Sequence, residues 1–180
     1  MRAVLIIDMQ EGMADRIRAG RPVATPDAPE RIATLLADAR GRGLPVIHVH
    51  HDDPDPASPF RKGEPAAVVM DCAAPMTGEV VLWKHHSSAF SGTGLDDHLR
   101  NLGVTELVVA GAVAVFCVTS TVRSASDLGY KVLLPQDALL GFDLAAHDGG
   151  RIDAATVLRV TLSILGADFA TLTSVADVTA

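Results

Sequence analysis

Short apolar runs alternate along the chain with stretches in which apolar residues recur every three or four positions. The runs are rich in Val, Ile and Leu and are too short for helices, so they predict buried strands. The periodic stretches predict amphipathic helices, and glycine follows several of them. The predicted strands are residues 3–7, 45–50, 80–83, 106–111, 131–135 and 169–172, and the predicted helices are 30–42, 95–102, 117–128 and 153–165.

Strands that alternate with helices and are apolar along their whole length favour a parallel sheet covered by helices on both faces. We therefore expect a single-domain, three-layer αβα fold with a central, mostly parallel sheet over residues 1–180. No repeat, linker or low-complexity tract divides the chain. The last predicted strand, 169–172, is expected at an edge of the sheet.

Composition narrows the class of protein. Of the 180 residues, 48% are hydrophobic and only 4% aromatic, so the core must be built mainly from aliphatic side chains and the chain is not disordered. A net charge of −7 disfavours nucleic acid as a partner. No apolar run reaches the roughly 18–20 residues that cross a bilayer, and the first residues lack a signal-peptide pattern. We therefore expect a cytoplasmic protein with no membrane partner.

Polar side chains stand at the carboxyl ends of the predicted strands, where ligands bind in open parallel sheets. Asp8 ends the first strand, Lys84 follows the third, and Cys117 begins the helix after the fourth. A helix N-terminus stabilises anions, so a reactive thiolate of low pKa is expected at Cys117. Asp8 could take the thiol proton and return it to a leaving amine, while Lys84 supplies positive charge. A small packed cysteine is the alternative interpretation.

The other cysteine, Cys72, lies in a predicted loop without charged partners in register, so we expect it to be non-catalytic. Two cysteines in a chain with no apparent export signal are expected to be reduced thiols and not a disulfide framework.

Three motifs resemble those of a known family. They are Val4-Leu-Ile-Ile-Asp8-Met-Gln10, Trp83-Lys84-His-His-Ser-Ser-Ala-Phe90 and Gly111-Ala-Val-Ala-Val-Phe-Cys117-Val118. In order and spacing, the chain resembles the isochorismatase-like cysteine hydrolases from residue 3 to about residue 174. The resemblance implies a triad with Asp8 as base, Lys84 as electrostatic partner and Cys117 as nucleophile. It also implies a cis peptide between Ala112 and Val113 and an oxyanion hole formed by the N–H groups of Val113 and Cys117.

The same resemblance implies a hydrolase that cleaves the C–N bond of a small amide, ureido or carbamoyl compound without a cofactor. The nucleophile would attack the carbonyl carbon, release the amine and leave a thioester for water to hydrolyse. Nicotinamidases and N-carbamoylsarcosine amidase are relatives on this branch, whereas isochorismatases proper typically lack the cysteine. Family members are commonly dimers or larger, so a homo-oligomer, a dimer or tetramer, is expected.

One departure from the family pattern concerns the loop before the cysteine. Ala114 and Val115 stand where the family commonly has Thr-Asp or Thr-Asn, which favours a less polar acyl group. The alternatives are that backbone groups suffice to bind the substrate, or that the chain is a non-catalytic or weakly active binding protein on the same fold.

No Gly-x-Gly-x-x-Gly follows the first strand, which argues against a nucleotide- or flavin-binding protein.

A second departure concerns metal. Pro54 stands where the zinc-binding nicotinamidases have a histidine. His48 and His50 share one face of a strand and could ligate a metal with Asp52, but two histidines without a third ligand more often line a pocket. No metal is therefore expected.

The substrate pocket is expected near the three motifs, and several of the few aromatic residues lie there, although ordinary packing would also explain them. The expected lining residues are Gln10, His48, Phe60, Phe90, Ala112 and Phe116.

Overall fold

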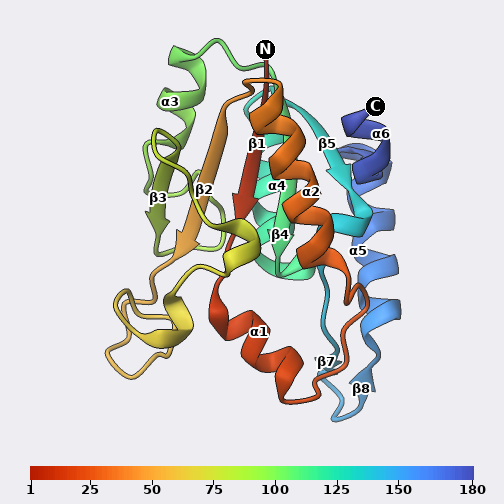
Figure 1. Cartoon of the computed structure of the whole chain (residues 1–180). Coiled ribbons are helices and arrows are strands. Elements are labelled where there is room, and N and C mark those ends of the chain that lie inside the picture. The colour runs from red at the N-terminus through yellow and green to blue at the C-terminus, as the bar shows by residue number, and fades with distance from the viewer.

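The computed structural model describes all 180 residues and contains a central seven-stranded sheet (Figure 1). Its strands are parallel and follow the order β3-β2-β1-β4-β5-β9, with β6 beside β4 where β5 ends. The bounds are β1 Arg2–Ile7, β2 Val46–His51, β3 Val80–Lys84, β4 Glu106–Ala112, β5 Lys131–Pro135, β6 Leu139–Leu140 and β9 Thr171–Thr173. A separate antiparallel pair joins β7, Leu144–Ala145, to β8, Arg151–Ile152.

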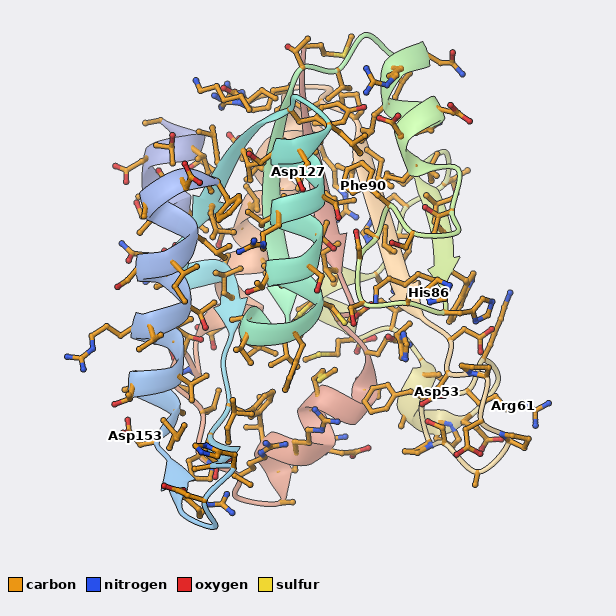
Figure 2. All side chains as sticks on the ribbon, turned by 180° about the vertical axis from the view of Figure 1, so that it is seen from behind. Asp53, Arg61, His86, Phe90, Asp127 and Asp153 are labelled. Carbon is orange, nitrogen blue, oxygen red and sulfur yellow. The ribbon has the colours of Figure 1, made fainter.

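Helices cover both faces of this sheet, which confirms the expected three-layer arrangement. Helices α2 (Ala28–Gly41) and α6 (Val175–Thr179) cover one face, with α1 (Glu11–Arg18) below it (Figure 1). Helices α3 (Leu95–Asn101), α4 (Thr119–Asp127) and α5 (Ala154–Asp168) cover the other face, which Figure 2 shows from behind. No helix is long and apolar enough to cross a membrane.

Alternating side chains of the central strands feed two separate cores. Val4 and Ile6 of β1 join a cluster of 22 buried residues under α2, whereas Leu5 and Ile7 join a cluster of 21 under α3, α4 and α5. Strands buried on both faces must be apolar throughout, so the continuous runs in the sequence were the correct signal for this sheet.

The six predicted strands and four predicted helices all form, with ends shifted by a few residues, and β9 lies at an edge as expected. Helix α1 was not predicted, because Met13 and Ile17 are the only large apolar residues in a stretch dominated by charged residues. The helix expected from Cys117 differs too: residues Ala114–Val118 form a single π turn, and α4 begins at Thr119.

Candidate functional site

The candidate site lies where the strand order reverses, between β1 and β4. The connections that follow β1 and β4 run over opposite faces of the sheet. This leaves a crevice beyond the carboxyl ends of these two strands. Ile7 lies opposite Gly111 in the ladder, so Asp8 comes next to the start of the loop that holds Cys117. Gly111 has φ +126°, and a Cβ there would overlap the Ile7 carbonyl oxygen. Glycine at this position therefore permits the close approach of the two strands.

Asp8, Lys84 and Cys117 meet in this crevice. Lys84 Nζ lies 2.8 Å from Asp8 Oδ2 and donates to Cys117 Sγ at 3.3 Å. The Lys84 side chain is fully buried and Asp8 is 1% exposed, so neither charge is solvated and each depends on the other. The ammonium thus bridges the carboxylate and the sulfur.

The sulfur of Cys117 lies in the π turn and is half-buried. Burial and the neighbouring Asp8 carboxylate raise the pKa of the Cys117 thiol to about 12, and Lys84 only partly opposes them. The expectation of a thiol with a low pKa is therefore wrong. The reason is that Cys117 precedes the first turn of α4, and burial outweighs the nearby positive charge.

Asp8 is placed to accept a proton. Its Oδ1 atom is buried and has no hydrogen-bond partner, whereas Oδ2 is held by Lys84. Burial raises the pKa of the Asp8 carboxyl, and the Lys84 ammonium opposes this shift. An unpartnered oxygen on a carboxyl of raised pKa is the arrangement that a general base requires.

A pocket of about 270 Å³ opens over Asp8 and Cys117, large enough for a small molecule. Three other residues expected in the site line it: Phe60, Val113 and Phe116. Lys84 is fully buried and does not line the pocket itself. The pocket residues that the sequence did not indicate are Met13, Arg16, His51 and Asp53.

Two residues expected in the pocket instead hold the scaffold together. The Gln10 amide donates to the carbonyl oxygens of His51 and Ala67 and accepts a hydrogen bond from the His51 N–H. Its side-chain hydrogen bonds therefore all go to backbone groups. His48 is fully buried, with Nε2 2.9 Å from a Glu79 carboxylate oxygen. Neither side chain lines the pocket, and both expectations are corrected.

Phe90 and Ala112 also lie outside the pocket lining. Phe90 stacks on Tyr130 with ring centroids 5.9 Å apart, and Figure 2 shows it well away from Asp53 at the pocket. Ala112 is fully buried under the loop, and its peptide bond to Val113 is cis. Three phenylalanines were expected in the pocket because aromatic residues are few in this chain. Two of them, Phe60 and Phe116, line it.

Ala114 and Val115 do not line the pocket either. Ala114 is buried in the core under α4, and Val115 packs against the other core. The absence of polar side chains at these positions therefore gives no information about the polarity of the acyl group, contrary to the expectation from the sequence.

His51 is the missed residue closest to the three central groups. Its Nδ1 lies 3.5 Å from Lys84 Nζ, and burial together with the Lys84 charge lowers the pKa of His51. A neutral imidazole therefore faces the ammonium. His51 is the last residue of β2, one position beyond the predicted strand end, so its place at the carboxyl edge was the available signal.

The residues considered for a metal diverge. His48 turns to Glu79, His50 packs edge-on against Trp83 with centroids 5.3 Å apart, and the Asp52 carboxylate accepts the N–H of Lys62. No group of three or more His, Cys, Asp or Glu side chains is arranged to hold a metal ion.

Comparison with known protein families gives a match between residues 2–163 and the family model described as the isochorismatase domain. The chain belongs to the isochorismatase family. A secreted isochorismatase effector of Verticillium dahliae is 32% identical over 97% of this chain and 88% of its own length. The maleamate amidohydrolase of Pseudomonas putida is 31% identical over 84% of this chain and 78% of its own. An isochorismatase-family crystal structure from Chromobacterium violaceum superposes with a TM-score of 0.93 and 37% identity, covering 99% of this chain and 91% of that one.

The matches confirm the family that the three motifs indicated and the fold that the strand pattern predicted. The motifs span the two central strands and β3, so they are the part of the sequence that builds the crevice.

Proposed function

We propose that this isochorismatase-family protein is a cysteine hydrolase that cleaves the C–N bond of a small amide, ureido or carbamoyl compound. The observation that carries the proposal is the buried Lys84 ammonium, 2.8 Å from Asp8 and 3.3 Å from Cys117 Sγ, below a pocket of small-molecule size. Relatives named as amide hydrolases, such as maleamate amidohydrolase, support the reaction class.

The reaction begins with transfer of the Cys117 proton to Asp8 Oδ1. The thiolate attacks the carbonyl carbon, and the C–N bond of the tetrahedral intermediate then breaks as Asp8 returns the proton to the leaving nitrogen. Water attacks the resulting thioester, with Asp8 again taking a proton, and the acid product leaves as the thiol is restored. Lys84 keeps its charge throughout and stabilises the anion on oxygen or sulfur in turn.

The oxyanion that forms on the carbonyl requires hydrogen-bond donors, and we assign them to the N–H groups of Val113 and Cys117. In support, Val113 lines the pocket and its N–H donates no hydrogen bond to the backbone. Removing one such donor typically lowers kcat by about 10²–10³.

The decisive experiment is ammonia release from a panel of amides, ureas and carbamoyl compounds. Cys117→Ala and Cys117→Ser should lose activity by about 10³-fold or more, as removal of a nucleophile does. Cys72→Ala is the matched control and should retain activity, because Cys72 lies outside the pocket. Full activity in Cys117→Ser would contradict the mechanism. A chain that binds panel compounds without turnover would instead be the binding protein considered as the alternative.

We also propose that the protein is a homo-oligomer. Helix α5 exposes Val160 and Ile164, which are 49% and 50% exposed, beside the partly exposed Ile152. Apolar side chains gathered on one face favour burial against a second copy. Light scattering after size exclusion should give a multimer, and Val160→Glu should shift it to a monomer.

A cytoplasmic location also remains a prediction. The Verticillium dahliae relative is described as secreted, so family membership alone does not fix the compartment. Fractionation of the source cells, with detection of the untagged chain, tests it. Recovery mainly from the medium would overturn it.

A further inference from the structure

Arg16 is an unusual charged residue in the pocket. It lies on α1, lines the same pocket as Cys117 and is half-buried, yet it forms no ion pair. The other half-buried arginines each pair with a carboxylate: Arg2 with Glu106, Arg21 with Asp143 and Arg40 with Glu79. A partly desolvated cation without a counter-charge is unfavourable. The position of Arg16 in the pocket therefore indicates that a bound ligand supplies the negative charge.

Apolar contacts hold the guanidinium in place. Its central carbon lies 5.3 Å from the centroid of the Phe60 ring, and one N–H group faces the Met13 sulfur at 3.6 Å. Gly12 makes room for this ring, because a Cβ there would lie 2.5 Å from a Phe60 carbon. Stacking on an aromatic face fixes the plane of a guanidinium while leaving its edge donors available.

Neighbouring charges do not neutralise Arg16. Arg21 lies close enough to lower the pKa of Arg16, adding to the effect of burial, so this neighbour does not supply a counter-charge. Asp53 also lines the pocket, but its carboxylate accepts the N–H of Asp55 and forms no ion pair with Arg16. Arg16 therefore lines the pocket without an ion pair to a carboxylate of the chain.

We propose that Arg16 binds a carboxylate of the substrate, which is therefore a small amide carrying a carboxylate remote from the scissile C–N bond. The inference rests on the proposed function for the position of the scissile bond at Cys117. A planar guanidinium matches a carboxylate through two parallel hydrogen bonds. A pocket of about 270 Å³ limits the substrate to a small molecule.

The test compares succinamate with butyramide, an uncharged amide of similar length, in the wild type and in Arg16→Gln. Loss of a charge-assisted hydrogen bond corresponds to about 10- to 100-fold. We expect Arg16→Gln to raise KM for succinamate by that factor, leave its kcat largely unchanged, and alter butyramide hydrolysis little. Arg16→Lys should fall between, because it keeps the charge but loses the planar fork.

Arg18→Gln is the matched control, because it removes the same charge from the same helix. Arg18 is exposed, pairs with Glu11 and Asp15, and does not line the pocket. This variant should leave both substrates unaffected. Equal effects of Arg16→Gln on both amides, or a wild type that prefers butyramide, would overturn the inference.

A binding measurement separates failure of this inference from failure of the proposed reaction. Calorimetric titration of succinamate into Cys117→Ala reports affinity without turnover, and adding Arg16→Gln should weaken it by the same factor. If butyramide is hydrolysed but succinamate binding is insensitive to Arg16, only the carboxylate site is wrong. If succinamate binding depends on Arg16 but no amide is turned over, only the reaction is wrong.

Discussion

Replacement of Lys84 by Met tests most directly how much the buried ion pair between Lys84 and Asp8 stabilises the fold. Met has a similar length and removes only the charge and its donors, which leaves Asp8 in a site where it is 1% exposed. Breaking a buried ion pair by removing one partner costs about 3–5 kcal/mol, because the remaining charge is uncompensated. Both side chains are almost fully buried, so no discount for solvent screening applies.

The loss in Lys84→Met should depend on pH in a defined direction. Burial already raises the pKa of Asp8, and removing the ammonium that opposes burial raises it further. Between the folded-state pKa of Asp8 in the wild type and its higher folded-state pKa in the variant, the folded variant holds up to one proton more than the folded wild type. Relative to the wild type, the stability of the variant therefore falls as pH rises through that window, by at most about 1.4 kcal/mol per pH unit.

Urea unfolding followed by far-UV circular dichroism measures this, at about pH 5.5 and about pH 8. We expect the larger destabilisation at the higher pH. The double variant Asp8→Asn, Lys84→Met should recover part of the loss at the higher pH, since it contains no buried charge. A loss below about 1 kcal/mol that is equal at both pH values, with no recovery in the double variant, would refute the reasoning.

Three further predictions follow from single contacts. Gln10→Ala should lower the free energy of unfolding by about 2–4 kcal/mol in urea titrations, because it leaves backbone groups of His51 and Ala67 unpaired; a specific rise in KM at full stability would contradict this. Gly111→Ala should give little folded protein on expression, because its Cβ overlaps the Ile7 carbonyl, and a native circular dichroism spectrum would be the contrary result. Iodoacetamide should label Cys117 slowly near neutral pH, because burial raises the pKa of its thiol to about 12, and the rate should rise by about tenfold per pH unit. Rapid labelling at acidic pH, mapped by mass spectrometry, would show that the pKa is low.

The sequence located the centre of the site because strand ends converge. Asp8, Lys84 and Cys117 follow different strands, and parallel topology brings the carboxyl ends of those strands to one edge whatever the loop conformations. An apolar run thus shows which residue ends a strand, and the structure then places the Lys84 ammonium 2.8 Å from Asp8 and 3.3 Å from Cys117 Sγ.

The pocket walls were less predictable because they depend on loops and on a short helix with few apolar residues. Arg16 lies on α1, a helix of 8 residues in which Met13 and Ile17 are the only large apolar side chains. Phe60 reaches the pocket because Gly12 leaves space for its ring, a contact between residues 48 positions apart. Gln10 illustrates the opposite error, since a polar residue next to a base can be used entirely for backbone hydrogen bonds.

The high thiol pKa is compatible with the proposed nucleophile once the movement of charge is followed. The value of about 12 describes loss of the proton while Asp8 remains charged, which would place two negative charges in one buried site. In the proposed first step the proton moves to Asp8, so one negative charge shifts from carboxylate to sulfur and the total charge stays the same. Lys84 contacts both positions, so the moving charge never leaves its counter-ion. Internal transfer to Asp8 avoids this second negative charge, but burial still disfavours the thiolate, so the resting site holds the thiol.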